Sequence, residues 1–137
     1  MRMEVYPLRL HPNMDVYISL QELLHKEGWA SCWIITGMGS LSQFSLRFAA
    51  QDDVCVRKGS YEICAMSGTL CMEGLHIHMV VSNEQGRSFG GHLREGCVIR
   101  TTAEIVLGYS KKFLFSRVYD QQTGYPELSI RALSTGE

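Results

Sequence analysis

Apolar and polar residues alternate with a period of two along residues 75–81, the pattern of a strand with one buried face. The odd-numbered positions of this segment are apolar, and two of the even-numbered positions hold His76 and His78. Successive side chains of a strand point to opposite faces, so both imidazoles are expected on the same face. The pattern therefore predicts a strand that presents two histidines together, opposite its apolar side.

A hairpin turn is predicted directly after this strand. Residues 83–87 read Asn-Glu-Gln-Gly-Arg, and a three-residue loop with Gly86 in the left-handed conformation would close the turn. Counting back along that register puts His78 opposite His92, with their β-carbons about 5 Å apart. The sequence thus predicts three imidazoles, those of His76, His78 and His92, on one face of one hairpin.

Gly90 and Gly91 lie just before the third histidine. Glycine weakens a strand, so two in succession indicate a β-bulge or a close approach of another backbone. As structural glycines they would bend the sheet, and the alternative is a gap for a ligand or a neighbouring subunit. A bulge would also shift the register and break the pairing of His78 with His92.

The rest of the chain predicts one helix and then mostly strands. Asn13 or Asp15 can cap a helix that runs to about residue 26, and Gly28 suits its left-handed C-cap. Gly37 to Ser40 are expected to turn the chain. Strands are expected at residues 5–10, 31–36, 41–49, 61–66, 75–82, 88–93, 97–107 and 112–119. Six to eight strands and one main N-terminal helix indicate an α+β fold, mostly an antiparallel β-sheet with the helix packed on it.

The composition is that of one globular domain. With 137 residues, 45% of them hydrophobic and 20% charged, we expect a single domain over residues 1–133 and a flexible tail at 134–137. The net charge of −1 gives no overall positive field for nucleic acid. No apolar run approaches the roughly 20 residues of a membrane span, and the first residues lack the apolar core of a secretory signal. We therefore expect a cytoplasmic chain with no membrane partner.

The five cysteines predict neither a zinc ribbon nor a redox pair, because no two of them are separated by two residues. Four of the five lie in apolar, strand-like surroundings, where cysteine acts as a small hydrophobic residue. We expect these thiols to be buried and reduced.

The strand predicted at residues 97–107 also has two faces. Arg100 and Glu104 share its polar face. One interpretation is a solvent-facing or ion-paired surface. The other places both side chains beside the histidines as pocket-lining groups, together with Glu62 from the strand at residues 61–66. The choice depends on the strand order, which the sequence does not supply.

A combination of motifs lies between residues 39 and 105, within a resemblance that covers roughly residues 5–118. The motifs are Gly-Ser-Leu at 39–41, GSYEICAMSG at 59–68, LHIHM at 75–79, Gly86, GGHL at 90–93 and RTTAEI at 100–105. Together they resemble the plants and prokaryotes conserved domain, which occurs alone in bacteria and archaea and fused to AT-hooks in plant nuclear proteins. The helix start departs from the family, because Pro-Asn-Met-Asp at 12–15 replaces a Gly-Glu-Asp-like start.

The resemblance implies an antiparallel sheet with flanking helices, assembled as a homotrimer. It also implies that His76, His78 and His92 are zinc ligands. Single-domain members often carry the name of DNA-binding proteins, because their plant relatives bind AT-rich minor grooves through a separate Arg-Gly-Arg-Pro core. This chain has no such core, and Gly86-Arg87 is its single Gly-Arg pair. We therefore expect no direct DNA binding by this chain alone.

Three histidines suit a zinc ion that keeps one position open. Zinc takes neutral imidazole nitrogens at about 2.0–2.1 Å and usually has four ligands. The fourth position would take water, a carboxylate or a group from a neighbouring subunit. A water bound there would have a lowered pKa, and Glu62 and Glu104 are candidate bases for its activation. The alternative is that the histidines form only a polar, hydrogen-bonded strand surface.

Two functions follow from these observations. The favoured one is a non-enzymatic homotrimeric binding or assembly module, in which the histidines hold a metal or a small ligand and the partners are its own copies or a further protein. The alternative is a metal-dependent enzyme that acts on a small molecule in a cleft between subunits. An open metal position with a nearby carboxylate and a pocket favours the enzyme, and a pocketless site favours the module.

Overall fold

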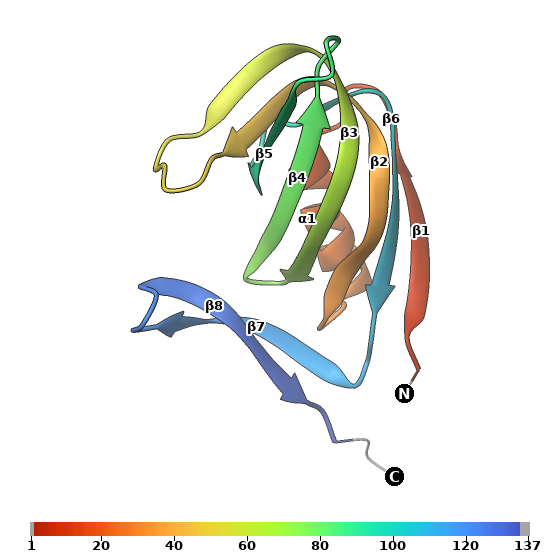
Figure 1. The fold of residues 1–137 in the computed structure, drawn as a ribbon. Coiled ribbons are helices and arrows are strands. Elements are labelled where there is room, and N and C mark those ends of the chain that lie inside the picture. Colours follow the sequence, from red (N-terminus) through yellow and green to blue (C-terminus); the bar gives the residue numbers. More distant parts are fainter. Residues whose placement is uncertain (1, 135–137) are drawn as a thin grey trace.

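The structure, a computed structural model, describes residues 2–134 and shows one helix and eight strands in two sheets (Figure 1). The elements are β1 (Glu4–Leu10), α1 (Val16–Glu27), β2 (Cys32–Arg47), β3 (Cys55–Cys71), β4 (Gly74–Ser82), β5 (Ser88–Leu93), β6 (Val98–Tyr109), β7 (Phe113–Asp120) and β8 (Tyr125–Ala132). This confirms an α+β fold with an N-terminal helix, although strands dominate it. The predicted tail at 134–137 lies outside the described residues except for Ser134.

Six strands form one antiparallel sheet in the order β1-β6-β2-β3-β4-β5. The end of β2 also pairs with β5, where Leu46 lies opposite Leu93 and Arg47 lies opposite His92. Strands β2, β3, β4 and β5 are therefore joined in a closed ring of pairings. Strand β5 is hydrogen-bonded on both sides, which fixes its position against β4.

The prediction of a turn at Gly37 to Ser40 is wrong, because β2 continues through these residues as one strand of 16 residues. Gly39 allows β6 to approach closely instead. A Cβ at Gly39 would lie 2.1 Å from the backbone oxygen of Thr102. The glycine there serves strand-to-strand contact and not chain reversal.

Helix α1 begins at the predicted cap. The Asp15 Oδ1 atom accepts a hydrogen bond from the Ile18 backbone N–H at 3.0 Å, and Gly28 ends the helix with a φ of 66°. The helix lies behind the large sheet in Figure 1 and buries Val16, Leu20 and Leu24. In the described part of the chain, no helix is long and apolar enough to cross a membrane.

The inward face of the large sheet is apolar. Along β4 the predicted alternation holds, because Leu75, Ile77, Met79 and Val81 are all buried. Burial of each such side chain contributes about 1.5–3 kcal/mol to stability. The even-numbered side chains of β4 are left on the outer face.

The cysteines are less uniformly buried than expected. All five thiols are free; Cys32, Cys71 and Cys97 are buried, whereas Cys55 is half-buried and Cys64 is exposed. Burial raises the pKa values of the Cys32 and Cys97 thiols to about 12. Cys64 is exposed because the pairing of β3 with β4 shifts at this residue.

Strands β7 and β8 form a separate hairpin, drawn in blue below the large sheet in Figure 1. The Phe115 N–H donates to the Ala30 oxygen at 2.8 Å, and an Arg117 N–H donates to the Thr69 hydroxyl of β3 at 3.1 Å. Strand β8 is absent from the predicted elements. The hairpin exposes four large apolar side chains, namely Val118, Tyr119, Tyr125 and Ile130.

Candidate metal centre

The turn between β4 and β5 has the predicted form. The Asn83 N–H donates to the Arg87 oxygen at 2.9 Å, and the Gly86 N–H donates to the Asn83 oxygen at 2.9 Å. Gly86 has a φ of 77°, as the three-residue loop requires. The register that follows puts His78 opposite His92, which confirms the predicted pairing.

Of the two alternatives predicted for the glycines before His92, the bulge is absent and the close backbone approach is present. The ladder is continuous from the Ser82–Ser88 pair to the His78–His92 pair. Gly91 is instead a point of close backbone approach, because a Cβ there would lie 2.6 Å from the Arg47 oxygen of β2. A Cβ at Gly90 would lie in ordinary contact, 3.4 Å from the Val80 side chain and 3.7 Å from the Met79 oxygen. Gly91 therefore permits the closure of β5 onto β2.

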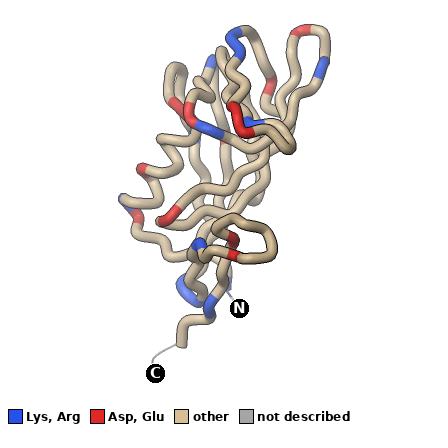
Figure 2. Tube along the Cα trace, turned by 90° about the vertical axis from the view of Figure 1, so that its left-hand side faces the viewer, with Lys and Arg blue, Asp and Glu red and all other residues tan. Residues whose placement is uncertain are grey.

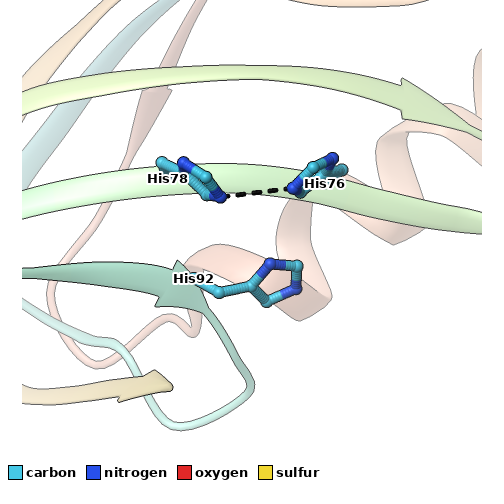
Figure 3. Close-up of side chains that lie close together, drawn as sticks. All are labelled: His76, His78 and His92. Atoms are coloured by element: carbon cyan, nitrogen blue, oxygen red, sulfur yellow. Dashed lines mark hydrogen bonds between the residues drawn. The ribbon is translucent and has the colours of Figure 1, made fainter. Parts of the chain in front are cut away.

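The structure brings the three histidines together on the outer face of β4 and β5 (Figure 3). The Nε2 atoms of His76 and His78 are 3.2 Å apart. One ring nitrogen from each of the three residues lies within 4.8 Å of the other two. His78 is exposed, and His76 and His92 are half-buried.

The donor set fits a zinc ion. Two nitrogens bound at about 2.0–2.1 Å in a tetrahedral arrangement lie about 3.3 Å apart, close to the 3.2 Å between His76 and His78. His92 offers a third ring nitrogen within 4.8 Å of the other two. Three imidazoles leave one tetrahedral position free for a further ligand.

His76 and His92 are held in the neutral form that metal binding requires. Burial, as the largest cause, lowers the pKa of His92 to about 4, and the charges of His76, Arg47 and Arg94 lower it as well. Burial also lowers the pKa of His76, with the charges of His78 and Arg117 acting in the same direction.

Several residues around the histidines were not predicted from the sequence. Arg47 lies opposite His92, and Ser67 of β3 lies opposite His78. Thr69 of β3 lies opposite His76 and accepts the hydrogen bond from Arg117. The carboxylate of Glu127 in β8 acts to raise the pKa of His76, whereas burial and the neighbouring positive charges lower it.

The structure does not bring Glu62, Arg100 or Glu104 next to the histidines. Glu62 lies opposite Ser82, four residues beyond His78 along β4, or about 13 Å at the rise of a strand. Arg100 and Glu104 lie on β6, which β2 and β3 separate from β4. All three side chains are exposed.

The surface cavities lie elsewhere as well. Four of the surface cavities on the described residues, of 380, 370, 480 and 500 Å³, are lined by no histidine of the cluster, although Arg94 lines the first of them. His78 itself is exposed. The histidine cluster is therefore an open surface site.

The chain is similar in sequence to part of a longer curated protein. It is 44% identical over 132 residues to the bifunctional protein GlmU of Synechococcus sp. (strain JA-3-3Ab), which covers 96% of this chain and 21% of that protein. The chain thus spans about a fifth of the length of this curated relative.

Solved structures share the fold. A hypothetical protein from Salmonella cholerae-suis is 35% identical, with a TM-score of 0.94 over 96% of this chain and 95% of that one. The metal-containing protein AF0104 from Archaeoglobus fulgidus is 22% identical, with a TM-score of 0.76 over 90% of this chain and 91% of that one. The Plants and Prokaryotes Conserved (PCC) domain matches residues 1–110. The chain therefore belongs to the plants and prokaryotes conserved domain family.

Proposed function

We propose that this chain is a non-enzymatic binding module in which His76, His78 and His92 hold a zinc ion. The observation that carries the proposal is the approach of three imidazole nitrogens to within 4.8 Å of one another on one sheet face. A protein of the same fold, from Archaeoglobus fulgidus, is described as metal-containing. Imidazole nitrogens suit zinc among the common metals.

A bound zinc would act as a Lewis acid that holds a ligand at its fourth position. The chain itself supplies the three imidazoles and keeps two of them neutral by partial burial. Neither Glu62 nor Glu104 lies near the site as a base, and the site is open to solvent at the exposed His78. These features favour a binding module over an enzyme.

We further propose that the module is a homotrimer. Support comes from apolar side chains exposed on the same outer face as the histidines, with Met38 exposed by 59%, Val5 by 53% and Val80 by 38%. Contact with further copies of the chain would remove this apolar area from water. The match to one fifth of a longer relative is also consistent with a module that acts as part of an assembly.

Direct DNA binding is not part of the proposal. Residues of both charge signs are interspersed along the described chain in Figure 2, and the chain has 13 lysines and arginines against 14 acidic residues. A DNA-binding surface would need clustered arginines and lysines. The cytoplasmic location expected from the sequence stays a prediction.

Elemental analysis tests the metal. Protein purified without chelator and supplied with zinc is expected to hold one zinc per chain, and the His78→Ala and His92→Ala variants are expected to hold none. Folded wild-type protein that stays metal-free under these conditions would contradict the proposed metal site. Light scattering tests the assembly, because a trimer has three times the chain mass of 15.5 kDa.

A further inference from the structure

Three arginines, Arg47, Arg94 and Arg117, lie close enough to the histidine cluster for their charges to lower the pKa of His76 or His92. Residues directly opposite in an antiparallel ladder share a face, so Ser67, His78, His92 and Arg47 form one row across β3, β4, β5 and β2. Arg47 therefore flanks the site on its β2 side.

Two more arginines come from segments next to the histidine cluster, one after β5 and one on β7. Arg94 comes directly after β5, two residues beyond His92. Its backbone N–H donates to the Ser45 backbone oxygen at 3.1 Å, which continues the pairing of β5 with β2. Arg117 reaches in from β7 and donates to the hydroxyl of Thr69, which lies opposite His76. The charges of all three arginines act on the histidines.

These arginines lack acidic partners. Within residues 2–134 the one ion pair joins Arg2 to Glu4, so it involves none of the three arginines. Arg47 donates to the neutral backbone oxygen of Gln51 at 3.2 Å, and Arg117 donates to a hydroxyl. A guanidinium has five N–H donors, so each of these arginines has donors to spare.

A metal held by three neutral imidazoles keeps its full positive charge. Three unpaired guanidinium groups around it add to that charge, and Glu127 is the one carboxylate that acts on His76. Oxyanions satisfy both kinds of group, because they bind metal ions and accept paired hydrogen bonds from arginine. A neutral ligand would leave the positive charges of the metal and the arginines uncompensated.

We propose that the open position of the histidine site takes a small ligand with an oxyanion group, a carboxylate or a phosphate, which Arg47, Arg94 and Arg117 help to hold. This inference rests on the proposed metal site and names the class of ligand that the site selects.

Cobalt substitution separates the two proposals. Protein loaded with Co²⁺ has a visible absorption spectrum that reports its ligands, and the probes are inorganic phosphate, acetate and the neutral compound glycerol. We expect phosphate or acetate, but not glycerol, to change the spectrum in a saturable way. A response to both oxyanions, or to one of them, supports the inference and identifies the preferred group.

Matched variants assign the effect to the arginines. Arg47→Gln and Arg117→Gln are each expected to weaken oxyanion binding about tenfold or more, since hydrogen bonds to charged groups are the strong ones, while cobalt still binds. Arg100→Gln, on the outer face of β6 away from the site, is the control and should bind the oxyanion like wild type.

The outcomes are distinct. Folded protein that binds no cobalt overturns the proposed metal site, and the inference with it. Protein that binds cobalt but shows no spectral response to either oxyanion overturns the inference alone. The same conclusion follows if the Arg47 and Arg117 variants bind oxyanion as wild type does, or if Arg100→Gln weakens binding equally.

Discussion

His78 and His92 lie directly opposite each other on the outer face of neighbouring strands β4 and β5. His76 joins them from two residues earlier on β4, with its Nε2 atom 3.2 Å from that of His78. One regular hairpin thus supplies all three nitrogens of the candidate metal centre.

Removal of a histidine should abolish tight metal binding. In His78→Ala or His92→Ala two imidazoles remain, and zinc affinity should fall by more than about 100-fold, beyond the loss typical of an outer-shell change. A competition titration against a coloured chelator measures this. His11→Ala and His25→Ala, whose exposed side chains are not in the cluster, are the controls and should keep wild-type affinity.

The two adjacent glycines should differ sharply in their tolerance to alanine. Gly91→Ala places a Cβ 2.6 Å from the Arg47 oxygen, so β5 must move from β2, at a cost of about 1–3 kcal/mol. Gly90→Ala makes no contact shorter than 3.4 Å and should change stability by less than about 0.5 kcal/mol. Thermal unfolding compares the two, and equal losses would contradict the close-approach role of Gly91.

The metal-free protein should lose stability in mild acid. The pKa of His92 is about 4 in the folded chain against 6.5 for an ordinary histidine, so the unfolded chain binds more protons between these values. The contribution of His92 is therefore fully present above about pH 6.5 and is lost as the pH falls toward about 4. His76, whose pKa is also lowered, acts in the same direction.

Urea unfolding at about pH 4.5 and about pH 7.5 measures this dependence. His92→Gln should flatten it, because glutamine does not titrate, whereas the exposed His11→Gln should leave it unchanged. Identical pH dependence in wild type and His92→Gln would refute the assignment to His92.

Asp15 should be worth more than an ordinary helix cap. Its Oδ1 atom caps α1 at the Ile18 N–H, and its Oδ2 atom accepts a 2.7 Å hydrogen bond from the Gly96 N–H. Asp15→Ala should cost more than the roughly 1 kcal/mol of a typical cap. Asp15→Asn keeps the cap acceptor but loses the acceptor for Gly96, so chemical denaturation should place it between wild type and Asp15→Ala.

The histidine cluster was predictable because it depends on local pattern. The alternation along β4 sets the face of His76 and His78, and the Asn83–Arg87 turn sets the register of His92. Arg94 also carried a signal, since it follows His92 by two residues.

The arginines from other strands were not predictable in the same way. Arg47 reaches the site because β2 pairs with β5, and Arg117 does so because the β7–β8 hairpin packs against β3. Both contacts join segments that are far apart in the chain, and no local periodicity encodes them. The strand order that separates Glu104 from the histidines is non-local as well.

The double pairing of β5 has a consequence for how the metal centre is assembled. An edge strand can fray, and a metal-binding side chain on it would then move away from the other two. His92 sits on a strand bonded to β4 on one side and to β2 on the other, so it separates from His76 and His78 only when both ladders open. The three imidazoles are therefore preorganised before any ligand arrives, and little conformational entropy remains to be lost when one binds.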